Sequence, residues 1–170
     1  MLSLLPKLFC ERLTDLTPED LTRRGVDLLL MDFDNTMLPY TTEQPTPELL
    51  AWLERMQAGG VRLCIVSNST KAHRVPVFSE RYGIPCVMRA QKPFRRGIRE
   101  AMTQFRAQRE QTALVGDQTY TDVLGANLAG VLSIQVRSIH NHTIWLKLRH
   151  LLELPPLAFI KNRRIHHDKS

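Results

Sequence analysis

The chain has 170 residues, which fits one domain and leaves little room for a second. Hydrophobic residues make up 43% and charged residues 24%, which excludes a disordered composition, and the aromatic content of 6% argues against a nucleic-acid surface built on base stacking. The formal charge of +6 favours anionic partners such as phosphate esters, anionic lipid or nucleic acid, but a soluble basic protein without such a partner fits it equally well.

The cysteines and the apolar segments bear on the compartment. Cys10, Cys64 and Cys86 form no CxxC motif, and an odd number of cysteines favours reduced thiols over a disulfide framework. No apolar run approaches the roughly 18 residues of a membrane-spanning helix. The apolar stretch 1–9 is broken by Pro6, which makes it a poor signal peptide. We therefore expect a cytoplasmic protein, with peripheral contact to the inner face of the membrane left open.

Strand-like and helix-like segments alternate along the chain. Short, nearly continuous apolar runs are typical of parallel strands buried on both faces, and helical stretches between them predict a doubly wound parallel sheet with helices on both sides. No internal repeat or low-complexity linker is present. In chain order we expect a strand at 26–33, a helix at 47–58, a strand at 61–66, a helix at 70–82, a strand at 84–88, a helix at 93–108, a strand at 113–115, a helix at 121–128, a strand at 131–136 and a helix at 141–152.

Prolines and glycines mark the ends of several predicted helices. Pro47 suits a helix start, and Gly59 a helix end. Pro76 predicts an irregularity inside the helix at 70–82. Pro93 is expected in the first turn of its helix, which would leave Lys92 at the helix mouth.

Two carboxylates follow the first predicted strand. In a doubly wound sheet, ligands bind at the carboxyl ends of the strands. Asp32 and Asp34 lie at such an end, where one acid can attack phosphorus and the other can move a proton. The alternative is a solvated strand-to-loop junction with an Asx-type turn at Asn35.

Polar residues also follow the second strand and precede the basic helix at 93–108. The hydroxyl and backbone N–H groups at Ser67 and Asn68 can hold phosphate oxygens, although Ser69 or Thr70 can equally cap the next helix. Lys92 can neutralise a bound phosphate and a carboxylate nucleophile together. Taken alone, it is better read as one of many exposed lysines.

The loop after the fourth strand carries two further acids, Asp117 and Asp122. Carboxylate oxygens are the ligands that Mg²⁺ prefers, with waters and a substrate phosphate completing the shell. The alternative assigns Asp117 or Thr121 to a helix cap, and Asp122 to the first helical turn, where negative charge is favourable anyway.

Taken together, these motifs resemble the haloacid dehalogenase-like (HAD) superfamily. The resemblance rests on DxDNT at Asp32 to Thr36, Ser67, Lys92 and GDxxxxD at Gly116 to Asp122, and it spans about residues 26–136. It implies a three-layer Rossmann-like α/β fold with a central parallel sheet, and a hydrolase as the class of enzyme. We expect a single domain over 1–170.

The resemblance also implies roles for these residues. Asp32 would be the nucleophile and form an aspartyl-phosphate. Asp34 would protonate the leaving group and then activate water, with Thr36 helping to position it. Ser67 and Lys92 would bind the transferring phosphoryl group. An acid at position 34 points to phosphatases and phosphotransferases and not to dehalogenases.

A Mg²⁺ cofactor follows from the same resemblance. Asp32, the backbone carbonyl of Asp34 and Asp117 would bind the ion, with Asp122 supporting the metal shell. The intervals between the motifs leave room only for the fold's own helices, so we expect no cap domain and an open site. Open sites suit substrates with bulky remainders.

A closer resemblance is to the YqeG-type group of HAD subfamily IIIA, which is related to the phosphatidylglycerophosphate phosphatases. It is carried by GVDLLLMDFDNTMLPY at 25–40, by the IVSNS and QKP stretches, and by VGDQTYTDVLGANLAG at 115–130. The N-terminal lead-in is also similar. Phe33 departs from the usual aliphatic residue and Met37 from the usual leucine, but both are apolar.

The resemblance and the charge pattern together predict a lipid substrate, phosphatidylglycerophosphate, bound at an anionic membrane surface. We expect Arg95 or Arg96 to contact its second phosphate, with Arg74 as a further candidate contact. In the basic C-terminal segment 141–170, we expect the helix at 141–152 to pack on the sheet, whereas the tail after it either contacts the lipid or is disordered. The alternatives are a phosphatase of a nucleotide, sugar phosphate or phosphoprotein, and a non-catalytic RNA- or protein-binding module. The oligomeric state is not predicted.

Overall fold

A parallel sheet forms the centre of the molecule. The structure is a computed structural model that describes residues 3–69 and 73–139. Its six strands lie in the order β1-β6-β5-β2-β3-β4, and every neighbouring pair is parallel. Strand β2 lies between β5 and β3, so the chain changes direction across the sheet there. The strands are β1 (Leu8–Cys10), β2 (Leu28–Met31), β3 (Arg62–Val66), β4 (Cys86–Val87), β5 (Thr112–Gly116) and β6 (Leu132–Val136).

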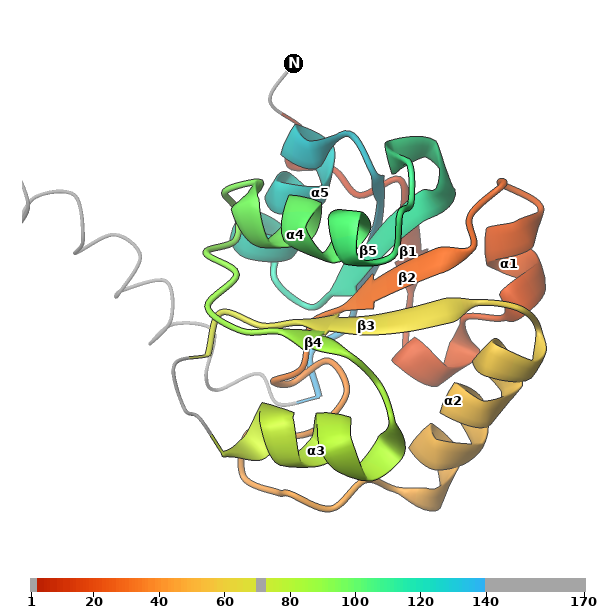
Figure 1. Cartoon of the computed structure of the whole chain (residues 1–170), viewed down its shortest axis with the longest axis vertical. Coiled ribbons are helices and arrows are strands. Elements are labelled where there is room, and N and C mark those ends of the chain that lie inside the picture. Colours follow the sequence, from red (N-terminus) through yellow and green to blue (C-terminus); the bar gives the residue numbers. More distant parts are fainter. Residues whose placement is uncertain (1–2, 70–72, 140–170) are drawn as a thin grey trace, which may run out of the picture. The chain divides into compact units, whose positions relative to one another are not determined.

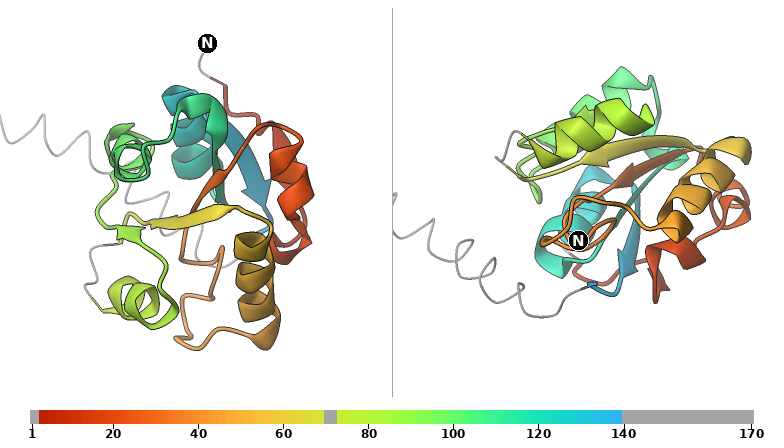
Figure 2. Two further views of the ribbon diagram at one scale, coloured as in Figure 1. Left: turned by 45° about the vertical axis from the view of Figure 1, so that its right-hand side comes forward. Right: turned by 90° about the horizontal axis from the view of Figure 1, so that it is seen from below.

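Helices cover both faces of this sheet (Figures 1 and 2). One buried apolar cluster joins α1, α2 and α3 to one face, and a second joins α4 and α5 to the other. The helices are α1 (Pro18–Thr22), α2 (Pro47–Ala58), α3 (Arg74–Tyr82), α4 (Arg96–Gln104) and α5 (Leu124–Ala129). Short 3-10 turns cover Leu13–Asp15 and Arg109–Gln111, and a π-helical turn covers Thr119–Val123.

Strand β2 shows why the sequence forms a sheet buried on both sides. Its four residues are fully buried, with Leu28 and Leu30 in one apolar cluster and Leu29 and Met31 in the other. Successive side chains of a strand point to opposite faces, so a continuous apolar run fills both layers. The predicted three-layer α/β fold is therefore confirmed. The connections 32–46 and 67–73 are too short for an inserted domain, as the prediction of a capless fold requires.

Most predicted elements are present, and helix α2 matches its predicted bounds. The short edge strand β1 was not predicted; it pairs with β6 through Leu8 opposite Ile134. The predicted irregularity at Pro76 is wrong for the described part of its helix. Because α3 begins at Arg74, Pro76 lies in the first turn, where its missing N–H is not needed.

The segment around Lys92 also differs from the prediction. Helix α4 begins at Arg96, so Pro93 is not in its first turn. The N–H of Phe94 donates to the carbonyl of Gln91 at 2.8 Å and closes a turn ahead of the helix. Lys92 therefore comes from a loop and not from a helix mouth.

The described part of the chain ends at Ile139. Residues Met1–Ile139 group into one compact unit, whereas the predicted C-terminal helix and tail at 141–170 lie outside the described residues. The single-domain assignment of 1–170 stays a prediction. Within 3–69 and 73–139, no helix combines the length and apolar character that crossing a membrane requires.

Candidate active site

Buried polar residues gather where the central strands end. Asp32 follows β2, Ser67 follows β3 and Asp117 follows β5, and these are three neighbouring strands. Because the strands are parallel, their carboxyl ends meet at one edge of the sheet. Eight polar side chains at this edge are buried: Asp32, Asp34, Asn35, Thr36, Ser67, Lys92, Asp117 and Asp122.

Lys92 is the central cation of the site. Its Nζ lies 2.7 Å from Oδ1 of Asp32 and 2.7 Å from Oδ1 of Asp122, and only 1% of its side chain is exposed. Burial alone would lower the pKa of Lys92. The negative charges of Asp122 and Asp32 outweigh burial and raise it, so the lysine stays charged. The reading of Lys92 as one more exposed lysine is wrong.

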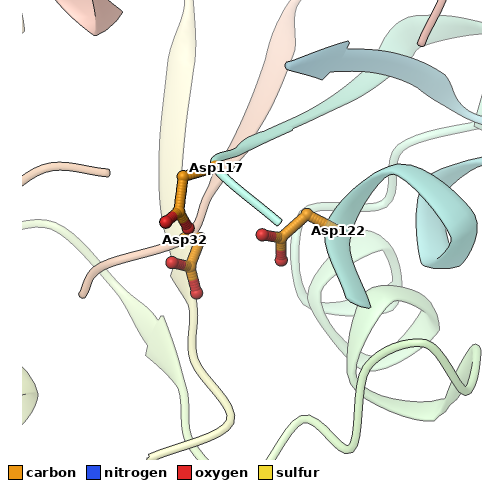
Figure 3. Close-up of side chains that lie close together, drawn as sticks. All are labelled: Asp32, Asp117 and Asp122. Carbon is orange, nitrogen blue, oxygen red and sulfur yellow. The ribbon is translucent and has the colours of Figure 1, made fainter. Parts of the chain in front are cut away.

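Three carboxylates converge on the same point. One oxygen each of Asp32, Asp117 and Asp122 lies within 4.8 Å of the others, and Figure 3 shows the three side chains turned toward one another. Oγ1 of Thr36 lies 3.3 Å from a carboxylate oxygen of Asp32 and 3.3 Å from one of Asp117. It also accepts the N–H of Asp117 at 3.1 Å. Thr36 thus holds Asp32 and Asp117 together, and its support of Asp34 stays a prediction.

This acidic cluster fits a divalent cation. Three buried carboxylates face a single ammonium group, Lys92, among the described residues. Burial, together with the charges of Asp32 and Asp117, raises the pKa of Asp122 to about 7, although Lys92 opposes the shift. A bound cation would offset this excess negative charge, and hard oxygen donors are what such ions prefer. Of the predicted ligands, the side chains of Asp32, Asp117 and Asp122 come together.

The residues at the end of β3 hold the site in shape. The amide of Asn68 donates to the carbonyl of Lys92 at 2.8 Å and accepts its N–H at 2.7 Å. Ser67 is buried, and its Oγ accepts the N–H of Ser69 at 3.1 Å. Asn68 therefore fixes the backbone of Lys92, a role other than the predicted substrate contact. Sequence spacing gave no signal for this pairing.

Asp34 lies apart from the three converging acids. Its Oδ1 accepts a hydrogen bond from Nη1 of Arg74 at 2.5 Å. Arg74 had been predicted only as a substrate contact, and nothing in the sequence indicated this pair across 40 positions. Arg95 and Arg96 are exposed at the start of α4. Their substrate role stays a prediction.

The chain belongs to the haloacid dehalogenase-like hydrolases, because the model of that family matches residues 7–130. One relative is the "Probable phosphatase YqeG" of Bacillus subtilis, which is 37% identical over 132 residues, covering 78% of this chain and 76% of the relative. Both the predicted superfamily and the YqeG-type group are confirmed. The predicted enzyme class, a phosphatase of this superfamily, is confirmed with them.

Solved structures agree on the fold. An uncharacterized protein from Listeria monocytogenes serotype 4b superposes with a TM-score of 0.55 at 13% identity, covering 75% of this chain and 99% of that one. The cobalt-bound deoxy-D-mannose-octulosonate 8-phosphate phosphatase YrbI from Haemophilus influenzae gives 0.53 at 13% identity, covering 77% and 89%. Identities this low show the shared architecture alone.

The close approach of Gly116 to Asp122 generates a first prediction. A Cβ at Gly116 would lie 2.3 Å from the Asp122 carboxylate, so Gly116→Ala should push Asp122 away from Lys92. We expect turnover and metal affinity to fall by roughly 10–100-fold, as for other losses of metal-supporting contacts. Gly25→Ala is the control, because a Cβ there meets nothing within 4 Å and its backbone strain, at a φ of 73°, falls before the amino end of β2, away from the site. Wild-type turnover in Gly116→Ala would contradict this account of the site.

The raised pKa of Asp122 generates a second prediction, for metal-free protein. Between the ordinary value of 3.8 and about 7, folded Asp122 binds more protons than unfolded Asp122. Its contribution to the free energy of unfolding therefore falls as pH rises through this range and levels off above it. The free energy of unfolding, measured by urea denaturation in EDTA at several pH values, should fall with pH more steeply for the wild type than for Asp122→Asn. If the difference in free energy of unfolding between the two proteins does not change with pH, the prediction is wrong.

Proposed function

We propose that this phosphatase is Mg²⁺-dependent and transfers a phosphoryl group first to Asp32 and then to water. The observation that carries the proposal is the 2.7 Å contact between Nζ of Lys92 and Oδ1 of Asp32 at a buried strand end. A carboxylate can attack an anionic phosphate only when their mutual repulsion is offset. Lys92 lies where it can offset that repulsion.

The proposed reaction has two steps, each at phosphorus. An Asp32 oxygen forms a bond to phosphorus while the bond to the ester oxygen breaks, and the departing oxygen takes a proton from Asp34. Asp34 then accepts a proton from water, whose oxygen attacks phosphorus and releases the Asp32 carboxylate and inorganic phosphate. Ser67 and Lys92 bind the phosphoryl oxygens throughout.

Mg²⁺ would be held by Asp32, the backbone carbonyl of Asp34 and Asp117, with Asp122 supporting the set. When bound, the ion supplies charge compensation for the phosphate and the attacking carboxylate. The buried cluster of Asp32, Asp117 and Asp122 supports a divalent cation at this place. The choice of Mg²⁺ over other divalent ions follows from the resemblance.

We propose phosphatidylglycerophosphate as the substrate and phosphatidylglycerol as the product. The likeness to the YqeG protein and the short connections after β2 and β3 support this choice, because an open site admits a phosphate on a bulky lipid. Exposed cations near Lys92, at Arg89, Arg95 and Arg96, suit a headgroup with a second phosphate.

Exposed aromatic residues in the site loops support contact with a membrane surface. Phe94, beside Lys92, has 71% of its surface exposed, and Tyr120, between Asp117 and Asp122, has 45%. Aromatic and basic side chains together suit the interface of an anionic bilayer. Peripheral attachment to the inner face of the membrane is part of this proposal.

The substrate assignment is tested by phosphate release from phosphatidylglycerophosphate in mixed micelles. We expect release that requires Mg²⁺, stops with EDTA and is lost in Asp32→Asn, because the amide cannot act as the nucleophile. An aryl phosphate, a nucleotide and a sugar phosphate serve as comparison substrates. Asp32-dependent turnover of these without lipid turnover would exclude the lipid, and binding of RNA or protein without any turnover would favour a non-catalytic module.

Headgroup recognition makes a separate prediction. Replacing Arg95 and Arg96 with Ala should raise KM for the lipid by about tenfold and leave KM for an aryl phosphate nearly unchanged, since one charge-assisted hydrogen bond is worth about that factor. Arg109→Ala is a matched control, because Arg109 is also exposed and comes after α4. Equal changes in KM for both substrates would exclude contact with the second phosphate.

A further inference from the structure

One arginine ties the catalytic loop after β2 to helix α3. Arg74 is the first residue of α3. Its Nη1 donates to Oδ1 of Asp34 at 2.5 Å. Its Nη2 donates to the carbonyl of Pro39 at 2.8 Å and to that of Thr42 at 2.5 Å. A single guanidinium group thus holds the carboxylate of Asp34 and the loop that follows it.

The surroundings of the guanidinium restrict it to this orientation. Its centre lies 5.4 Å from the ring centroid of Phe33 and 5.4 Å from that of Tyr40, within cation–π range of both. Side-chain exposure is only 12% for Arg74 and 11% for Asp34. Two rings, two carbonyls and one carboxylate therefore fix a planar group, and a lysine could not make the same set of contacts.

The contact with Arg74 explains why an aromatic residue stands at position 33. Phe33 packs edge-on against Phe78 of α3 at 5.3 Å between ring centroids, and Arg74 lies over the same ring. An aliphatic residue there would fill the core but would present no π face to the guanidinium. The presence of an aromatic residue at position 33, in place of the usual aliphatic one, is therefore explained by its contact with Arg74.

We propose that Arg74 is a positioning residue that holds the Asp34 carboxylate beside the reacting phosphoryl group. The two carboxylates that act on the substrate then have separate cations, Lys92 on Asp32 and Arg74 on Asp34. The inference rests on the acid–base role given to Asp34 in the proposed function.

If Arg74 acts through Asp34, its loss reduces proton transfer and not substrate binding. Arg74→Ala should therefore lower kcat by roughly tenfold or more, short of the 10²–10⁴-fold that general acid–base catalysis itself supplies, with KM little changed. The loss should be larger for an alkyl phosphate than for an aryl phosphate, because a poor leaving group depends more on protonation. Guanidinium ion added to Arg74→Ala should restore part of kcat.

A double-mutant cycle with Asp34→Asn tests the inference directly. Once Asp34→Asn has removed the acid–base group, adding Arg74→Ala should cause little further loss, since residues that act as a unit are not additive. Arg74→Lys keeps the positive charge but loses the several N–H donors of the guanidinium group. The lysine variant replaces Arg74→Ala in the cycle if the alanine variant does not fold.

Arg62 provides a matched control at the amino end of β3. It also pairs with one carboxylate, of Asp27 at 2.7 Å, donates to one carbonyl, of Phe105 at 2.7 Å, and lies over the ring of Phe105. Arg62→Ala should lower the thermal midpoint and leave kcat unchanged.

The possible outcomes separate the inference from the proposed function. Additive losses in the cycle, or a loss confined to KM, would overturn the role of Arg74 and leave that of Asp34 standing. Full activity of Asp34→Asn would overturn both. A loss of kcat in Arg62→Ala equal to that in Arg74→Ala would reduce Arg74 to a structural contact.

Discussion

The buried ammonium group of Lys92 is the constraint on which the site depends. A charge removed from water is tolerated only when opposite charges surround it, and Lys92 meets this condition through Asp32 and Asp122. These partners come from the end of β2 and from the turn before α5, and Asn68 fixes the backbone of Lys92 against the end of β3. Moving either acid away would leave Lys92 with one buried counter-charge instead of two.

Different cations contact different carboxylates of the site. Lys92 and a divalent cation would balance the acids that face the phosphate, whereas Arg74 hydrogen-bonds Asp34. A nucleophile and a proton-transfer group can then lie two positions apart without sharing one counter-charge. Gly116 contributes by having no side chain, which lets Asp122 approach closely. Stability and chemistry therefore depend on one set of interactions.

Local patterns were enough to predict much of this. Continuous apolar runs located the core strands, and polar residues at their ends located Asp32, Ser67 and Asp117, because parallel strands bring their carboxyl ends together. The start of α4, the edge strand β1 and the partners of Asn68, Thr36 and Arg74 were missed. The late start of α4 follows a local turn between Gln91 and Phe94. The other missed features depend on residues distant in sequence: Arg74 is 40 positions from Asp34, and Leu8 in β1 pairs with Ile134 in β6. Spacing within one segment contains no information on such pairs.

The proposed mechanism requires Asp32 to carry the phosphoryl group during turnover. Borohydride reduces an acyl phosphate to an alcohol, so quenching the enzyme with borohydride during turnover and sequencing its peptides by mass spectrometry tests the claim directly. If Asp32 is the nucleophile, homoserine will appear at position 32, only with substrate and metal present, and will be absent from Asp32→Asn. Rapid phosphate release with Asp32 unmodified under the same conditions would contradict it and would indicate direct attack by water.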